Sequence, residues 1–274
     1  RSGKEVPDGI NRRMRTSLNK PITSWNGRRV WVVGASSGIG AAFARALIGK
    51  GARVALSARN ASALAGIAAT GSPDQTLQLP LDVTRPAEIA AAFDCISSSW
   101  SGLDLAVLLA GSHQAVRAWD LDAAQARILV ETNLIGIMNA SAVLVPAFCR
   151  SSRGAIAVVS SVAGYGGLPS SLIYGATKAA LINFTETLYL DLAPRGIGVY
   201  LINPGFVKTP LTDRNEFKMP ALISAEQAAE EMIKGFEDGK FEIHFPKRFT
   251  FWLKLLRFLP YGMYFPLIHK LTGL

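Results

Sequence analysis

Short apolar runs rich in valine, isoleucine and leucine alternate along the chain with longer segments of helical periodicity. The apolar runs, which we expect to form strands, cover residues 30–34, 53–57, 77–81, 105–109, 155–160, 198–202 and 241–245. Helical patterns lie between them, near residues 38–50, 60–69, 86–99, 120–148, 174–194 and 224–236. The runs at 106–110 and 156–159 are continuously apolar, which indicates strands that helices cover on both faces. The alternation therefore predicts one doubly wound α/β domain around a seven-stranded parallel sheet.

Three segments divide the chain around this domain. We expect residues 1–27 to be a basic N-terminal tail, residues 28–245 to be the α/β domain, and residues 246–274 to be a C-terminal extension. Within the domain, residues 209–223 interrupt the alternation of strands and helices. We interpret them as a loop or lid over a site.

The net charge of +9 is concentrated at the two ends of the chain. Residues 1–30 carry eight Lys or Arg against two acids, and residues 240–274 carry six against one. Residues 31–239 carry fifteen against seventeen. A nucleic-acid groove would place basic residues across the body of the domain, so we expect no nucleic-acid partner. The pattern favours contact between the ends and an anionic surface.

Composition and cysteine content indicate an intracellular globular protein. Apolar residues make up 49% of the chain, enough for a sizeable core. The two cysteines, Cys95 and Cys149, match neither a metal site nor a disulfide framework, so we expect no metal and a reducing compartment. The first thirty residues lack the apolar run of a secretory signal, and no uninterrupted apolar run is long enough to span a membrane. We expect a cytoplasmic location.

A glycine-rich turn joins the first predicted strand to the first predicted helix. It reads Gly34-Ala35-Ser36-Ser37-Gly38-Ile39-Gly40 and leads directly into helical sequence. Glycines permit a tight turn and the close approach of a pyrophosphate, which the free N–H groups and the dipole of the helix start would bind. The spacing GxxxGxG differs from the GxGxxG of other dinucleotide folds. A strand-to-helix turn without a ligand is the alternative interpretation.

The end of the second predicted strand indicates which dinucleotide would bind. An acid often stands there to hydrogen-bond the ribose 2′-hydroxyl, but this chain has Ala58 followed by Arg59. A guanidinium pairs well with a phosphate, so the pair favours NADP over NAD. A solvated loop charge is the other interpretation of Arg59.

Several polar residues have the spacing of a catalytic site. Tyr174 and Lys178 lie four residues apart, and therefore on one face of a predicted helix. Because a nearby ammonium favours the phenolate, we expect the pKa of Tyr174 to fall from about 10 toward neutral pH. Ser160 and Ser161 end a buried strand, and Asn133 lies in an apolar helix where its amide needs a partner. Singly, these residues could be a surface pair, a turn and a satisfied amide, but their order beside a glycine turn favours catalysis.

With these motifs, residues 28–245 resemble the short-chain dehydrogenase/reductase family, which implies a Rossmann-type fold. The resemblance implies a catalytic set of Ser161, Tyr174, Lys178 and Asn133, the last holding a water that links Lys178 to solvent. In it, Asp82 would bind the adenine ring and residues 204–209 would grip the nicotinamide carboxamide. The implied contacts to NADP(H) are Gly34, Ser36, Ser37, Gly38, Ile39, Gly40, Arg59, Asp82, Val83, Ala110, Gly111, Tyr174, Lys178, Pro204, Gly205, Val207 and Thr209.

The resemblance also implies a reaction, the interconversion of a carbonyl and a secondary alcohol. Ser161 would orient the carbonyl oxygen, Tyr174 would supply the proton, and Lys178 would hold the ribose hydroxyls. The chain departs from the family where Asn-Asn-Ala-Gly is common, because it has Leu108-Leu109-Ala110-Gly111. The missing amide usually braces the sheet, so we expect local repacking and weaker cofactor binding.

Residues 246–274 combine aromatic, aliphatic and basic side chains. We expect a helix over 249–259 that Pro260 ends, then a second apolar stretch, 261–271, that Pro266 interrupts. Cations beside aromatic residues and leucines suit a helix in the lipid headgroup region, so peripheral membrane contact is one interpretation. Packing on a partner subunit or over the substrate cleft is the other.

Apolar residues elsewhere in the chain indicate what kind of substrate the site would accept. Apolar residues near Tyr174 favour a small hydrophobic, lipid-like carbonyl or alcohol; they are Leu168, Leu172, Phe206, Leu211, Phe217, Met219, Leu222 and Ile223. A catalytically idle NADP-binding protein that acts as a sensor or scaffold at a membrane surface is the alternative function. We also expect a homo-oligomer, either a dimer or a tetramer.

Overall fold

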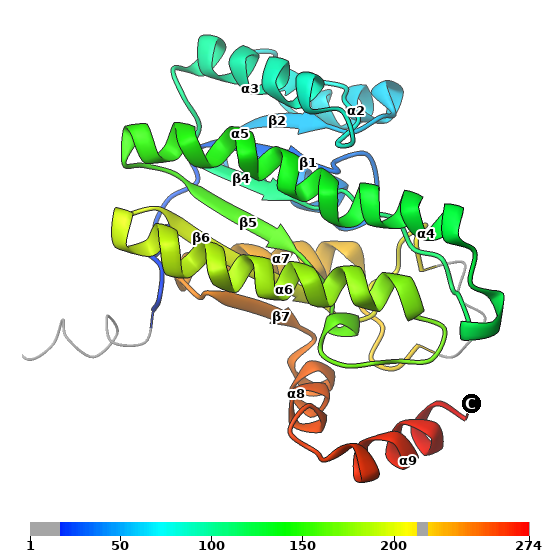
Figure 1. Ribbon diagram of the computed structural model, residues 1–274. Coiled ribbons are helices and arrows are strands. Elements are labelled where there is room, and N and C mark those ends of the chain that lie inside the picture. Colours follow the sequence, from blue (N-terminus) through cyan, green and yellow to red (C-terminus); the bar gives the residue numbers. More distant parts are fainter. Residues whose placement is uncertain (1–16, 213–218, 274) are drawn as a thin grey trace, which may run out of the picture.

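A seven-stranded parallel sheet forms the centre of the computed structural model, which describes residues 17–212 and 219–273 (Figure 1). The order across the sheet is β3-β2-β1-β4-β5-β6-β7. The strands are β1 (Arg29–Val33), β2 (Arg53–Ser57), β3 (Thr76–Gln78), β4 (Leu105–Leu108), β5 (Ala155–Val159), β6 (Gly198–Pro204) and β7 (Glu242–Phe245). The predicted fold class and all seven strands are therefore confirmed, with β3 shorter than expected.

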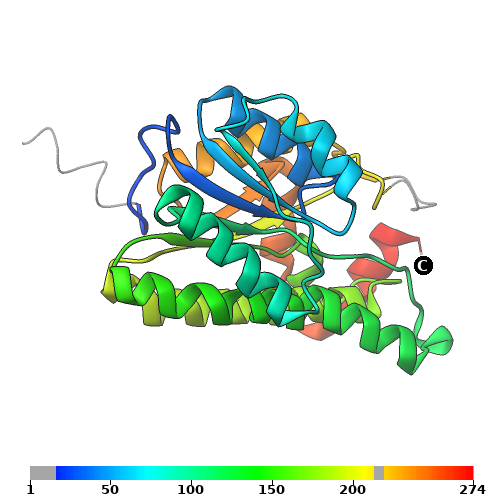
Figure 2. The same cartoon turned by 90° about the horizontal axis from the view of Figure 1, so that it is seen from above.

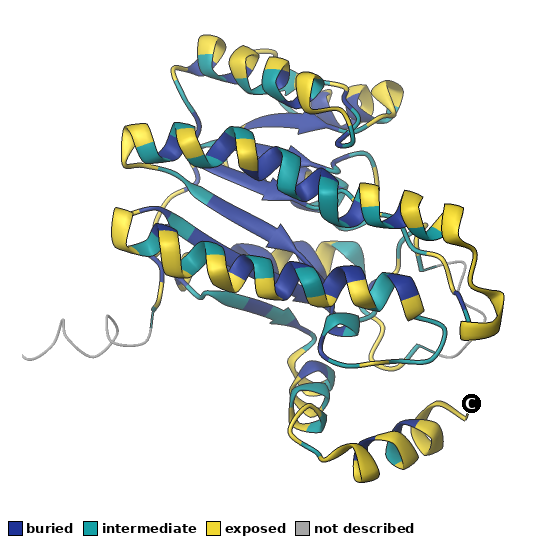
Figure 3. Cartoon of the chain, viewed as in Figure 1, coloured by how far each residue is buried: buried dark blue, intermediate teal, exposed yellow. Residues whose placement is uncertain are grey.

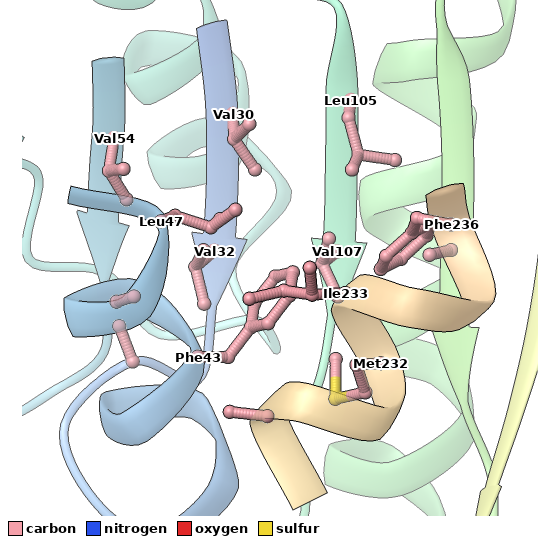
Figure 4. Packing of buried hydrophobic residues seen from close by; sticks show 14 of the residues in the cluster. Val30, Val32, Phe43, Leu47, Val54, Leu105, Val107, Met232, Ile233 and Phe236 are labelled. Atoms are coloured by element: carbon pink, nitrogen blue, oxygen red, sulfur yellow. The ribbon is translucent and has the colours of Figure 1, made fainter. Parts of the chain in front are cut away.

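Helices cover both faces of the sheet, as the apolar strands require (Figure 2). One face carries α1 (Gly38–Gly49), α2 (Ala61–Ala68) and α7 (Ala225–Glu237). The other carries α3 (Pro86–Trp100), α5 (Gly136–Ser151) and α6 (Leu172–Leu192). In the first layer, Phe43 and Leu47 of α1 and Phe236 of α7 pack over Val32 and Val107 (Figure 4). Each face therefore has its own apolar core.

The strand order fixes where a ligand can enter. From β1 the chain moves outward through β2 to β3, and then returns to place β4 on the other side of β1. The loops after β1 and β4 therefore diverge at the carboxyl end of the sheet, and doubly wound sheets bind ligands in this crevice.

The helix predicted over residues 120–148 is divided into parts. A short 3-10 turn, Ala118–Asp120, precedes α4 (Ala123–Val130), and a π-helical turn, Glu131–Ile135, joins α4 to α5. Asp122 caps α4 by accepting a hydrogen bond from the backbone N–H of Gln125 at 2.7 Å. A π turn inserts one extra residue and so rotates the following helix by about 100°, a shift that periodicity assessed over the whole run does not locate.

Ala123–Ser151, the run from α4 through α5, is the one described helical stretch with the length and hydropathy of a membrane span. Its inner face places Ile137, Leu144 and Phe148 in the apolar core beside the sheet. The run is therefore accounted for as a core helix of the α/β domain.

The end of the predicted N-terminal tail packs on the domain. Ile22 and Trp25 are buried, and the Asn19 side chain exchanges two hydrogen bonds with the backbone of Val199, at 2.8 and 3.0 Å. Residues 17–27 thus add to the body, whereas residues 1–16 lie outside the described residues.

Two helices follow β7, α8 (Lys247–Leu256) and α9 (Tyr261–Thr272), and Figure 1 shows both below the end of the sheet. Pro260 separates them as predicted. The predicted interruption at Pro266 is wrong, because α9 continues through this residue. Pro266 and Gly262, four residues earlier, are both exposed, so water can satisfy the carbonyl that loses its donor.

Candidate functional site

The loops at the carboxyl ends of β1, β4, β5 and β6 converge on one site. They contain the glycine turn, the segment after Leu108, the pair Ser160-Ser161, and residues 204–209. Backbone and side-chain contacts join these loops, so the structure brings together motifs that lie far apart in sequence.

The three glycine positions of the turn leave no room for a side chain. A Cβ on Gly34 (φ +102°) would lie 2.7 Å from the backbone nitrogen of Ala110, and one on Gly40 would lie 2.1 Å from the carbonyl oxygen of Gly34. A Cβ on Gly38 (φ +53°) would lie 2.8 Å from Cγ2 of Thr209. Only glycine therefore fits at these three positions, and the turn contacts two other predicted cofactor segments.

The start of α1 is suited to an anion. Its first turn, which the structure describes in full, contains no acidic residue, and the side chain of the N-cap residue Ser37 makes no capping hydrogen bond within the described chain. Ser36 and Ile39 beside it are half-buried, and Ser37 is exposed. The N–H groups of a helix start then remain available to a phosphate. These residues fit a dinucleotide pyrophosphate.

Arg59 and Asp82 lie near each other beyond the ends of β2 and β3. Asp82 accepts hydrogen bonds from the backbone N–H and the hydroxyl of Thr84, at 2.9 and 2.8 Å. These bonds, together with the charge of Arg59, lower the pKa of Asp82 against the opposing effect of burial. Arg59 is exposed at the same edge, and Val83 is buried beside it. The edge therefore places a cation, Arg59, and an acceptor, Asp82, where they fit the adenosine half of a cofactor.

The structure groups Ser161, Tyr174 and Lys178 as predicted. Nζ of Lys178 is buried and donates to the carbonyl oxygen of Val159 at 3.0 Å, and it lies 5.5 Å from the ring centroid of Tyr174. Ser161 hydrogen-bonds Tyr174, and its Oγ accepts from the backbone N–H of Ala163 at 3.1 Å. A phenol, a hydroxyl and an amine thus share one side of the site.

Asn133 holds the loop that follows β4. Its Nδ2 donates to the carbonyl oxygen of Ser112 at 2.8 Å, and its Oδ1 accepts from the N–H of Ser112 at 2.7 Å. A Cβ on Gly111 would lie 3.3 Å from Oδ1 of Asn133 and 3.7 Å from Nζ of Lys178. The backbone of Ser112 therefore satisfies the amide of Asn133. The side chains of Asn133 and Lys178 both border the small space beside Gly111.

The predicted fall in the pKa of Tyr174 is wrong. Burial raises the pKa of Tyr174, and the hydrogen bond with Ser161 opposes this only in part. Burial also lowers the pKa of Lys178 to about 8, because the apolar surroundings disfavour its charge. Sequence spacing showed that the two groups are close, but it could not show that both lose solvent. The result is a phenol that keeps its proton at neutral pH.

The shifted pKa of Lys178 predicts how stability depends on pH. Above about pH 8 the folded lysine is neutral, whereas the unfolded one keeps its proton up to about 10.5. The unfolded state then binds more protons, so stability rises with pH by up to about 1.4 kcal/mol per pH unit in this window. We expect the unfolding free energy of the wild type, minus that of Lys178→Met, to increase from about pH 7 to about pH 10 in denaturant titrations. A constant difference would contradict the shift.

His113 is a site residue that sequence patterns did not indicate. Its ring meets the Tyr174 ring edge-on, with the centroids 4.8 Å apart and an interplanar angle of 83°. It lies in a segment that the Val116 backbone N–H ties to the Ser170 carbonyl oxygen at 3.0 Å. The contact between His113 and Tyr174 depends on tertiary folding. In the sequence, the position of His113 three residues after Ala110 was the only indication that it could lie near the site.

Leu109, where the chain departs from the family, packs against the apolar core. Its backbone N–H still donates to the carbonyl oxygen of Val33 at 2.8 Å. This connection between β1 and β4 is therefore made by the backbone, and the expected repacking and weaker cofactor binding stay predictions.

The segment after β6 closes the nicotinamide side of the predicted site. The Gly205 N–H donates to the carbonyl oxygen of Phe245 at 2.7 Å, and Val207 is bridged to Ile223. Thr209 bonds with Thr212 and stands against Gly38. Part of the predicted lid, residues 213–218 with Phe217, lies outside the described residues.

Relatives of known sequence match most of this chain. A family model described as short chain dehydrogenase matches residues 28–219. An uncharacterized oxidoreductase of Myxococcus xanthus (strain DK1622) is 34% identical over 235 residues, which make up 85% of this chain and 93% of that relative. An uncharacterized oxidoreductase of Staphylococcus haemolyticus (strain JCSC1435) is 31% identical over 77% of this chain and 92% of its own length.

Solved structures have the same fold. A short-chain dehydrogenase/reductase from Burkholderia phymatum in complex with NAD superposes with a TM-score of 0.78 at 24% identity, over 85% of this chain and 94% of that one. A short chain dehydrogenase from Burkholderia cenocepacia J2315 in complex with NADP gives 0.71 at 28% identity, over 81% and 89%. One from Sphingobium yanoikuyae in complex with NADPH gives 0.73 at 26% identity, over 86% and 97%. The chain therefore belongs to the short-chain dehydrogenase family and is an NAD(P)-dependent oxidoreductase of CH–OH and C=O groups.

Proposed function

We propose that the protein is an NADPH-dependent reductase of a hydrophobic ketone or aldehyde. The observation that carries the proposal is the site itself, in which a phenol with a raised pKa stands beside a serine hydroxyl and a buried lysine. In the reductive direction the phenol of Tyr174 would give its proton to the carbonyl oxygen as the carbonyl carbon receives the hydride.

Each residue has a distinct role in this reaction. Bound NADPH would supply the hydride. Ser161 hydrogen-bonds the carbonyl oxygen and orients it toward Tyr174, which donates the proton to that oxygen. Lys178 would hold the ribose hydroxyls of the bound cofactor, and it provides positive charge beside the phenol when it is protonated. Asn133 fixes the loop at Ser112 and so maintains the space between that loop and Lys178.

The preference for NADPH rests on the edge beyond β2. Arg59 is exposed there, and Ala58 stands where an acid would repel a 2′-phosphate. Two similar solved structures contain NADP or NADPH, which is compatible with this choice, and another contains NAD. The arginine is the residue of this chain that supports NADPH.

Replacing Arg59 tests this preference. A charge-assisted hydrogen bond contributes about 1.5–3 kcal/mol, so Arg59→Ala should raise the KM for NADPH about tenfold or more and leave the KM for NADH nearly unchanged. Arg53→Ala, at the other end of the same strand and also exposed, is the matched control. Equal changes in both KM values for Arg59→Ala would remove the basis for the NADP preference.

Apolar surface around the entrance supports a hydrophobic substrate. The segment with Trp119 and Leu121, both exposed, is bridged to Ser171 at the start of α6. Leu172, Leu211 and Leu222 are also exposed large apolar residues in segments that border the site. A substrate with an apolar body would cover surface that otherwise contacts water.

A screen of NADPH oxidation against hydrophobic ketones and aldehydes tests the proposed reaction. Turnover that increases with the apolar size of the carbonyl compound would support it, and activity restricted to small polar carbonyls would contradict it. NADPH binding without oxidation of any compound would instead favour the sensor or scaffold. The cytoplasmic location and the homo-oligomer stay predictions.

A further inference from the structure

Half of the large exposed apolar side chains of the described chain lie in the C-terminal extension. Eight of the sixteen fall between residues 251 and 271, although the extension is a small part of the described residues. Trp252 is 66% exposed and Phe258 is 82% exposed. Figure 3 shows α9 exposed along most of its length. A monomeric soluble surface rarely gathers apolar side chains in this way.

The inner side of the extension is attached firmly to the domain. Tyr264 donates its hydroxyl to the carbonyl oxygen of Gly167 at 2.9 Å, and the ring of Phe249 lies 5.6 Å from that of Phe206. Phe249 and Leu253 also pack on buried residues of the domain. The inner side therefore packs on the chain's own domain, and the outer side is held in a fixed orientation.

A half-buried acid strengthens this attachment. Glu242 of β7 accepts hydrogen bonds from the Tyr165 hydroxyl at 2.6 Å, from Nδ2 of Asn203 at 2.8 Å and from Nζ of Lys254. Burial by itself raises the pKa of Glu242, but these bonds hold it below its usual value. Lys254 is thus committed to the domain and is not part of the outer surface.

The outer surface is apolar and basic. Residues 246–274 contain five Lys or Arg and no Asp or Glu. Lys247, Arg248, Arg257 and Lys270 are exposed and flank the exposed aromatic residues of α8 and α9. Two such surfaces facing each other would oppose like charges, so this composition disfavours a second copy as the occupant. Anionic phospholipid headgroups over acyl chains complement both features.

We infer that the outer side of α8 and α9 docks on an anionic phospholipid surface. The inner side contacts the loop at Tyr165 and Gly167, which connects Ser161 to Tyr174. Figure 1 shows the extension at the end of the sheet toward which the strands point, where the site lies. Docking therefore brings the catalytic crevice close to the bilayer. The inference concerns binding alone and does not depend on the proposed reaction.

Flotation of the full chain with vesicles tests the inference. We expect it to float with vesicles of phosphatidylcholine and phosphatidylglycerol, and to float less with phosphatidylcholine alone. High salt should weaken the binding, because it screens the basic residues. The double variant Trp252→Glu/Phe258→Glu should reduce the affinity for mixed vesicles at least about tenfold, since carboxylates would replace two inserted rings.

A control variant shows whether vesicle binding depends on this surface or on any exposed apolar residue. Leu190 is 72% exposed near the far end of α6, so Leu190→Glu should bind mixed vesicles like the wild type. Equal thermal midpoints of both variants would show that the fold is retained. Wild-type binding by the double variant, or no flotation of the wild type, overturns the inference. A wild-type dimer that the double variant converts to a monomer overturns it too, because a second copy would then cover the surface.

Discussion

Tyr174→Phe is expected to lower turnover by about 10²–10⁴-fold and to leave the affinity for NADPH nearly unchanged. The phenol stands beside Ser161 and carries the proton that the carbonyl oxygen would receive. Phenylalanine keeps the ring that meets His113 edge-on but removes the hydroxyl. Steady-state turnover with the substrate found by screening measures the first effect, and NADPH fluorescence titration measures the second.

Tyr189→Phe is the control for this variant. Tyr189 lies on the same helix, and its hydroxyl donates to the carbonyl oxygen of Leu18 at 2.8 Å at the surface. Removing that hydroxyl should leave turnover unchanged. If Tyr174→Phe retained near-normal turnover, another group would have to supply the proton, and the assigned chemistry would be wrong. If it lost NADPH binding as well, the tyrosine would act mainly by shaping the cofactor site.

The fold and the outline of the site could be predicted because their signals are local. Strands buried on both faces are continuously apolar, and the turn at Gly34 and Gly40 needs residues without a Cβ. The need for apolar strand residues and the need for glycine in the turn each concern residues that are adjacent in the sequence, so the sequence alone shows both. The order of Ser161, Tyr174 and Lys178 added the family resemblance, which the relatives then confirmed.

The remaining features depend on contacts between distant segments. The pKa of Tyr174 is set by how much of the fold covers it, and spacing to Lys178 does not report burial. His113 reaches Tyr174 only because two loops are bridged at Val116 and Ser171. Asn133 was expected to need a partner, but the partner proved to be backbone twenty-one residues away in the chain. None of these contacts produces a repeating pattern of apolar and polar residues in the sequence.

The structure of the C-terminal extension could be predicted only in part, because it too depends on contacts between distant segments. Its composition indicated two helices separated by Pro260, and α8 and α9 are present. Composition could not decide whether these helices pack on the domain or remain exposed, because each helix has one side that packs and one side that is exposed. The Glu242 hydrogen bonds come from a strand, a loop and α8, so only the folded chain shows which lysine of the extension is held by the domain.

Gly40→Ala is expected to abolish high-affinity NADPH binding, with a loss of at least about a hundredfold. The new methyl group would lie 2.1 Å from the carbonyl oxygen of Gly34, a backbone atom, and a Cβ has no side-chain torsion that could move it away. Relief requires the turn to move, and moving it displaces the N–H groups at the start of α1 from the phosphate. A hundredfold loss corresponds to about 3 kcal/mol. Overpacking should also lower the unfolding free energy by about 1–3 kcal/mol.

Gly49→Ala, in the same helix, separates this effect from a general response to alanine. A Cβ at Gly49 meets nothing within 4 Å among the described residues, so this variant should bind NADPH normally. It should also gain up to about 1 kcal/mol of stability, because alanine is the better helix former. Calorimetric titration with NADPH and denaturant unfolding of both variants give the comparison. Normal NADPH affinity in Gly40→Ala would mean that the turn does not hold the pyrophosphate, because the clash alone forces its backbone to shift.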